Sequence, residues 1–312
     1  MGRINSLPAI FNINKPIIGA LHFMPLLGFD GFDGFERILD NAVKDARALE
    51  EGGIDGIIFE NNYDLPHKID VGPETVASMT YLCNELRKEI SVPHGISVLW
   101  NDYRTALSIA NVTNGKFIRV PVFVDSVKTD FGTILAKPDE VTSYRSKLGM
   151  DKIKIFTDIQ VKHATMLQER PIAESAIDAQ KHGSDALILT GKWTGNAPDI
   201  AKLMEARKAA DIDIIVGSGF DASNAASILE YSDGAIVSTS LKEGSEVSGE
   251  RNVKPAQARI SVQKVSALII RASEPYFCAS IADSAIGLSW SIVACFTCMS
   301  VVKSIRRNGE QI

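Results

Sequence analysis

Residues 212–244 read IDIIVGSGFDASNAASILEYSDGAIVSTSLKEG, and this stretch decides the fold. Two short apolar runs, 212–216 and 234–237, have the β-branched composition of strands that are buried on both faces. An amphipathic helix ending at Glu230 is predicted between them. Each strand runs into a turn of small residues, and these turn residues are Gly217, Ser218 and Gly219, then Ser238, Thr239 and Ser240. Two such strand ends late in a β/α chain are typical of the phosphate site of a (β/α)8 barrel.

The two turns have two interpretations. Small residues let backbone N–H groups come close to a bound anion, which predicts a phosphate-binding site. Alternatively, the Gly-Ser-Gly sequence is only a tight turn between a strand and a helix. Because two such turns follow consecutive strands, we favour phosphate or another anion.

The same alternation of apolar runs and helical periodicity continues through the rest of the chain. The other expected strands are 16–22, 56–59, 95–100, 117–122, 153–157 and 186–189. The other expected helices are 35–51, 73–90, 103–112, 138–148, 171–183, 198–210 and a last one at 255–270. Eight strands alternating with helices require a parallel sheet, and their number and length predict a (β/α)8 barrel over residues 1–270. A doubly wound open sheet is the alternative, but no GxGxxG motif follows the first strand.

Composition limits the classes of partner and compartment. The 312 residues are 45% hydrophobic and 23% charged, as in soluble globular proteins. The net charge of −5 gives no basic footprint for nucleic acid. Four cysteines give no disulfide framework and suit a reducing compartment.

The first fifteen residues hold Arg3 and Lys15 without a long apolar run, so we expect a cytoplasmic protein whose N-terminal segment closes the bottom of the barrel. A mitochondrial matrix location is the alternative.

The last stretch, residues 271–312, departs from the barrel pattern and is expected to be an appended tail. Within it, 285–302 carries no charge and is followed by Lys303, Arg306 and Arg307. A run of this length is at the short edge of the transmembrane range, and basic residues after it read as a cytoplasmic-side flank. The tail therefore permits membrane contact. The alternative, which we favour, is a tail that is disordered or packs loosely on the barrel.

Polar residues follow most of the expected strands, at the end where barrel enzymes place their function. The catalytic candidates are His22, Glu60, Asp102, Asp158 and His163. The ligand-binding candidates are Asn61, Asn101, Arg119, Lys162, Thr190 and Gly191. Carboxylates beside histidines suit acid–base chemistry or a hard divalent cation, although the spacing is not a metal signature and the cofactor stays open. Asp102 has an alternative role as a helix N-cap.

A lysine also lies within an expected strand. Lys154 shares a strand face with Asp158 because side chains alternate along a strand. Such a lysine can act as a Schiff-base nucleophile, or it can pair with a carboxylate. We favour the structural pairing.

The motifs after the strands follow an order that resembles a known family. They read HFMPLLG at 22–28, ENNYD at 60–64, ND at 101–102, FIRV at 117–120, TDFG at 129–132, DIQVKHA at 158–164, TGKWTG at 190–195, and the two anion turns. Over about 16–242 this set resembles the BtpA family, the photosystem I biogenesis protein type. The resemblance implies a phosphate-binding (β/α)8 barrel. Leu27, Pro121 and Gln160 depart from it, standing where the family often has proline, asparagine and histidine.

Two functions are compatible with these observations. The first is an enzyme that acts on a small phosphorylated or ribosyl-containing metabolite, as a lyase, an isomerase or a nucleosidase-like hydrolase. The second is a non-catalytic assembly factor, as the resemblance implies, that retains a ligand pocket. In both cases we expect a small anionic metabolite as the partner and a homo-oligomer as the assembly.

Overall fold

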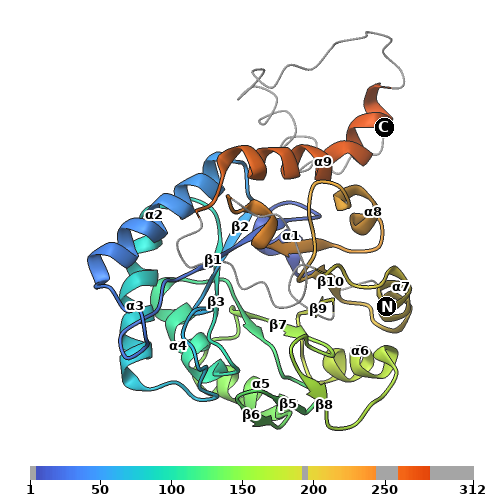
Figure 1. Cartoon of the computed structure of the whole chain (residues 1–312). Coiled ribbons are helices and arrows are strands. Elements are labelled where there is room, and N and C mark those ends of the chain that lie inside the picture. Colours follow the sequence, from blue (N-terminus) through green and yellow to red (C-terminus); the bar gives the residue numbers. More distant parts are fainter. Residues whose placement is uncertain (1–4, 192–195, 244–258, 282–312) are drawn as a thin grey trace.

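The computed structural model describes residues 5–191, 196–243 and 259–281 (Figure 1). In these residues eight parallel strands close into a barrel in the order β1-β11-β10-β9-β7-β4-β3-β2. The barrel strands are β1 Ile17–His22, β2 Gly56–Glu60, β3 His94–Ser97, β4 Phe117–Val120, β7 Lys154–Asp158, β9 Ala186–Leu189, β10 Asp213–Val216 and β11 Gly234–Val237. The predicted (β/α)8 barrel is therefore confirmed.

The helices cover the outside of this barrel, as Figure 1 shows. They are α2 Phe35–Glu51, α3 Pro73–Leu86, α4 Tyr103–Thr113, α5 Pro138–Lys147, α6 Ile172–Lys181, α7 Ile200–Ala209, α8 Ala225–Leu229 and α9 Val262–Ile281, with a 3-10 turn η1 at Thr239–Leu241. Their apolar faces meet the outward side chains of the strands in one large buried cluster. Parallel strands covered on the outside by helices and filled on the inside explain why strands such as β9 and β11 are continuous apolar runs.

The N-terminal segment closes the bottom of the barrel, as predicted. The short helix α1, Leu7–Phe11, begins where Asp213 at the start of β10 accepts the backbone N–H groups of Ser6 (2.6 Å) and Leu7 (2.9 Å). Leu7 and Phe11 join the inward side chains of the strands in a second buried cluster, where Phe11 meets Phe117 edge-on with ring centroids 5.8 Å apart. The lower half of the barrel is thus filled by side chains of the strands and of α1.

The connection between β4 and α5 contains secondary structure of its own. It contains β5 Val127–Thr129 and β6 Gly132–Ile134, which pair with each other, and β5 also pairs with β8, Thr165–Met166. This small antiparallel sheet joins the loops after β4 and β7 above the barrel. Strand β3 is also shorter than predicted, because the N–H of Trp100 leaves the ladder and donates to the carbonyl of Lys68 (2.9 Å).

The last helix differs from its predicted position. Helix α9 covers Val262–Ile281 and packs beside α2 and α8 (Figure 1), whereas the sequence predicted a helix at 255–270. Ala272 and Ser273 are buried, so the helix contributes to the barrel beyond Ile270. The uncharged run 285–302 lies outside the described residues. Among the helices that the structure describes, none combines the length and apolar character needed to cross a membrane.

Candidate functional site

A cavity of about 850 Å³ opens at the carboxyl ends of the barrel strands. His22 and Glu60 line it at the ends of β1 and β2, and Arg119 lines it from the interior of β4. The loop after β7 contributes Lys162 and His163. Both predicted anion turns, 217–219 and 238–240, also line this cavity. The structure therefore brings most of the predicted site residues to one place.

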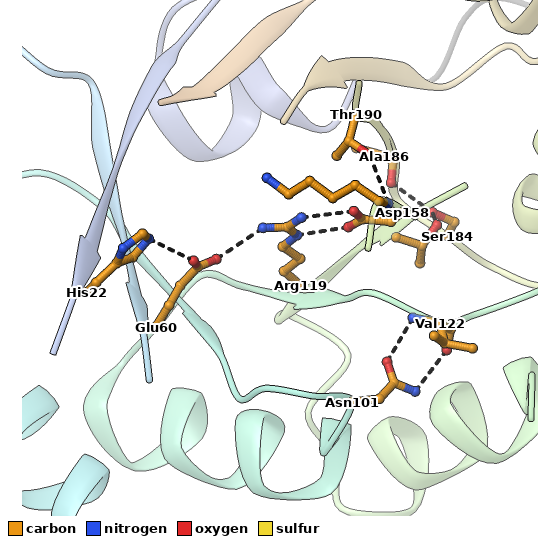
Figure 2. A network of polar contacts seen from close by, with 11 residues as sticks. His22, Glu60, Asn101, Arg119, Val122, Asp158, Ser184, Ala186 and Thr190 are labelled. Atoms are coloured by element: carbon orange, nitrogen blue, oxygen red, sulfur yellow. Dashed lines mark hydrogen bonds and ion pairs between the residues drawn. The ribbon is translucent and has the colours of Figure 1, made fainter. Parts of the chain in front are cut away.

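A chain of ion pairs crosses the floor of the cavity (Figure 2). The bidentate pair between Arg119 and Asp158 has Nε to Oδ1 and Nη2 to Oδ2 distances of 2.8 Å each. Arg119 also donates from Nη1 to Glu60 Oε1 at 3.2 Å. The second oxygen of Glu60, Oε2, lies 3.2 Å from His22 Nε2. Four strands, β1, β2, β4 and β7, thus meet through four buried or nearly buried side chains.

The charges of this chain are fixed by its mutual contacts. Burial alone would raise the pKa of Glu60, but the hydrogen bond from His22 and the charge of Arg119 outweigh burial and lower that pKa to about 2. Burial lowers the pKa of His22 more than its contact with Glu60 raises it. At neutral pH Glu60 is therefore ionised and His22 is neutral. Because an ionised carboxylate can only accept, Nε2 of His22 carries the proton and Nδ1 is the acceptor.

Lys162 is a partly buried cation above this chain. Two non-glycine residues in the left-handed region, Gln160 (φ 51°) and His163 (φ 58°), lie on either side of it in the loop after β7. Such backbone strain is concentrated at functional sites. The N–H of Lys162 donates to Thr190 Oγ1 (3.2 Å), which fixes the loop to the end of β9. Burial, together with the charge of Arg119, lowers the pKa of Lys162 to about 8 despite the nearby carboxylates.

The first anion turn is held by the neighbouring loop. Ser218 Oγ accepts the N–H of Gly191 (2.7 Å) and donates to the carbonyl of Asn196 (2.9 Å). A Cβ at Gly219, whose φ is +61°, would lie 2.0 Å from the backbone nitrogen of Ala197. The sequence explained this glycine by the approach of a ligand, but here the approaching group is the chain itself.

The second anion turn is hydrogen-bonded to the first, and one of its hydroxyls has no hydrogen-bond partner in the described part of the chain. Ser240 Oγ donates to the carbonyl of Phe220 (2.9 Å), which connects the two turns. Ser238 Oγ is buried, and it has no hydrogen-bond partner among the described residues. A buried hydroxyl in that state has capacity for a bound acceptor.

Three predicted site residues act in the scaffold. Asp102 caps α4 by accepting the N–H of Thr105 (2.9 Å), which is the N-cap alternative, and its catalytic role stays a prediction. Asn61 accepts the N–H of Leu99 at 2.7 Å. Asn101 exchanges two hydrogen bonds with the backbone of Val122, at 2.8 and 3.0 Å (Figure 2). These side chains hold the loops around the cavity and do not line it.

The structure adds residues that the sequence did not single out. Lys242 is buried beside the cavity, and its Nζ donates to the hydroxyl of Tyr63 (3.0 Å). Tyr63 lies edge-on to His22 with ring centroids 5.9 Å apart. Lys242 lies two residues after the second anion turn in the sequence, and this position could have identified it as a site residue. Aromatic residues on other loops also line the cavity, and no sequence pattern grouped them.

Two further chemical predictions can be compared with the structure. Lys154 Nζ pairs with Asp185 Oδ1 at 2.9 Å, as favoured over a Schiff-base role. The described residues contain no group of three or more histidine, cysteine, aspartate or glutamate side chains placed to hold a metal ion. The divalent cation stays a prediction. Cys295 and Cys298 have the CxxC spacing of some metal and redox sites, for which their apolar surroundings in the sequence are unfavourable, and both lie outside the described residues.

Alternating strands and helices that close into an eight-stranded barrel, with a cavity at the strand ends, define the class as a (β/α)8-barrel protein. The model of the BtpA family matches residues 13–267. The chain belongs to the BtpA family.

Sequence relatives support this assignment across most of the chain. An uncharacterized protein of Archaeoglobus fulgidus is 41% identical, covering 77% of this chain and 96% of its own. The Photosystem I biogenesis protein BtpA of Synechocystis sp. is 36% identical, covering 74% of this chain and 82% of its own. An uncharacterized mitochondrial protein of Caenorhabditis elegans is 32% identical, covering 76% and 89%.

Solved structures support the fold alone. Tryptophan synthase of Mycobacterium tuberculosis superposes with a TM-score of 0.54 at 16% identity, covering 86% of this chain and 98% of its own. Thiamine phosphate pyrophosphorylase of Pyrococcus furiosus gives 0.52 at 15% identity, covering 84% and 97%. At such identities the likeness extends to the barrel and not to its chemistry.

Proposed function

We propose that the protein is an enzyme that acts on a small phosphorylated or ribosyl-containing metabolite by acid–base chemistry. One observation carries this proposal: a buried chain from His22 through Glu60 and Arg119 to Asp158 on the floor of a cavity with two small-residue turns on its rim. Buried, mutually oriented ionisable groups in a large cavity are the usual composition of an active site.

Each residue takes a role from its contacts. His22 is the general base, because Glu60 holds its Nε2–H and leaves Nδ1 as the proton acceptor. Lys162 is the general acid, since its pKa of about 8 permits proton transfer near neutral pH. Arg119 and Asp158 position Glu60 and are not in the proton path. The turns at 217–219 and 238–240 hold the phosphate between them, with the hydroxyl of Ser238, unpartnered among the described residues, as a donor and the remaining backbone N–H groups of the turns beside it.

The test is a screen of phosphate esters and nucleosides for turnover, followed by His22→Gln. Loss of a general base reduces kcat by about 10²–10⁴-fold. His182→Gln is the matched control, because His182 is a histidine on the surface that pairs with Asp139 (2.8 Å) away from the cavity. Equal turnover in the two variants would remove His22 from the mechanism. Asp158→Asn is a less specific test, because it also leaves the buried Arg119 with one carboxylate fewer.

The second candidate is a non-catalytic assembly factor. The observation that favours it is the 36% identity to the Photosystem I biogenesis protein BtpA of Synechocystis. Absence of turnover with every phosphate ester and nucleoside, together with retained binding, would support this second candidate. We propose the cytoplasm as the compartment, with the mitochondrial matrix as the alternative. The name of the Caenorhabditis elegans relative, which says mitochondrial, favours a mitochondrial location. A fluorescent fusion distinguishes the two compartments.

A further inference from the structure

The cavity has a second wall that the proposed acid–base chemistry does not use. This wall is apolar and aromatic, and its side chains are Leu65, His67, Trp100, Phe131 and Val161. They come from four separate loops, after β2, β3, β4 and β7. We call this set the ring wall.

The ring wall faces the anion turns across the barrel mouth. In the closed order β1-β11-β10-β9-β7-β4-β3-β2, strand β10 stands four places from β3, and β11 stands four places from β4. In a ring of eight, four places is the opposite side. The anion turns follow β10 and β11, whereas Trp100 and Phe131 follow β3 and β4. The ion-pair chain from His22 to Asp158 lies on the floor between the two sides.

The ring wall is uncharged at neutral pH. His67 meets Phe131 edge-on with ring centroids 5.1 Å apart, and burial lowers the pKa of His67 to about 4, so its ring is neutral. Trp100 is only 7% exposed. It packs with Val127, Val161 and neighbouring residues in a separate buried cluster under the small antiparallel sheet. This packing holds the wall in place without a ligand.

The volume of the cavity sets the size of the ligand. Pockets of roughly 300–1,000 Å³ enclose ligands the size of a drug or a nucleotide. At about 850 Å³ this cavity is near the upper end of that range. A sugar phosphate at the anion turns would leave the ring wall covered only by water, which is unfavourable for apolar surface.

We propose that the ligand is a phosphate ester that carries a planar aromatic or heteroaromatic ring, of the nucleoside monophosphate class. The phosphate lies at the turns 217–219 and 238–240, and the ring lies against His67, Trp100 and Phe131. The bond between ring and sugar then lies above Glu60 and Arg119. This inference rests on the anion site of the proposed function and adds the ring to it.

The experiment compares three probes by isothermal titration calorimetry on the full chain: adenosine 5′-monophosphate, ribose 5-phosphate and adenosine. Stacking of one base on aromatic side chains contributes about tenfold to a hundredfold in affinity. We therefore expect the nucleotide to bind at least about tenfold more tightly than ribose 5-phosphate. Phe131→Ala should remove this advantage and leave ribose 5-phosphate unchanged. Phe131→Tyr keeps a ring at that position and should retain it.

A second variant tests the opposite end. Ser238→Ala removes a hydroxyl that has no partner among the described residues, so it breaks no hydrogen bond recorded there. It should weaken both phosphate esters by the same factor and leave adenosine unchanged. If ribose 5-phosphate binds as tightly as the nucleotide, or if Phe131→Ala weakens both equally, the ring wall is not a binding surface for a ring.

Failure of this inference is distinguishable from failure of the proposed function. Nucleotide binding that depends on Phe131, without turnover of any phosphate ester, supports ring binding at the ring wall and refutes the catalytic role. Turnover of a phosphate ester that has no ring, with affinity independent of Phe131, supports the catalytic role and refutes the ring wall.

Discussion

Replacing Glu60 by glutamine should destabilise the protein in a manner that depends on pH. The Glu60 side chain is almost fully buried, and its two oxygens contact different partners, Arg119 at 3.2 Å and His22 at 3.2 Å. These contacts lower its pKa from 4.5 to about 2, against the effect of burial. Glu60→Gln keeps the size of the side chain, removes the charge and replaces one acceptor oxygen by an NH2 donor.

The magnitude follows from the two pKa values. The pKa of Glu60 is lower in the folded state than in the unfolded state, so the ionised group contributes stability above the unfolded pKa of 4.5, and this contribution is lost as the pH falls towards about 2. A difference from 4.5 to about 2 corresponds to about 3 kcal/mol. Glu60→Gln should therefore reduce the free energy of unfolding by about 3 kcal/mol near neutral pH, and by progressively less in acid.

The assay is urea unfolding followed by far-UV circular dichroism at several values from neutral pH down to about pH 3. The wild type and the variant should differ most near neutral pH, and the difference should narrow to about half by pH 3. Glu85→Gln is the matched control, because Glu85 lies on the surface of α3 and pairs with Lys88 at 2.6 Å. Its effect should be small, as for exposed ion pairs in general. A gap between wild type and Glu60→Gln that stays constant with pH would refute the electrostatic explanation.

Three further predictions concern the scaffold. Phe11→Ala opens the bottom layer against Phe117 and should lower the free energy of unfolding by about 3–5 kcal/mol in the same urea assay; a loss below about 1 kcal/mol would mean that α1 is not part of the core. Asp102→Ala removes the N-cap of α4 and should destabilise by about 1–2 kcal/mol while turnover of the folded enzyme is retained; a kcat loss comparable to that of His22→Gln would return Asp102 to the mechanism. A chain ending at Ile281, the last residue of α9, should melt and bind phosphate like the full chain, whereas loss of cooperative melting would place the tail in the core.

The fold was predictable because strands of a parallel barrel are buried on both faces, so that several of them appear in the sequence as short apolar runs. The apolar runs at Ala186–Leu189 and Gly234–Val237 and the helix at Phe35–Glu51 coincide with the predicted bounds. These elements are stabilised by burial of their own pattern of side chains. The small antiparallel sheet was not predictable in this way. Its strands are two or three residues long, and Val127 finds its partner in Met166 on another loop.

The candidate site was predictable where the barrel geometry itself assembles it. His22, Glu60 and Asp158 end their strands, and carboxyl ends of parallel barrel strands converge on one mouth. The ring wall was not predictable, because Trp100 and Phe131 lie on loops whose course is set by tertiary contacts. Only the ring order of the strands places these residues opposite the anion turns.

Residue type alone does not separate a working carboxylate from a scaffold carboxylate. Asp102 accepts hydrogen bonds from the backbone N–H groups of Thr105 (2.9 Å) and Val71 (3.1 Å). Both donors belong to the backbone, so their positions are fixed by the fold. Glu60 instead contacts the side chains of His22 and Arg119, which come from other strands and line the cavity. The side chains of His22 and Arg119 can change rotamer and bind a ligand in place of the Glu60 carboxylate. The N-terminus of α4, in contrast, loses stability when its Asp102 cap is removed. The chemistry of the site is therefore expected at Glu60 and its partners, while Asp102 keeps the rim of the cavity in position.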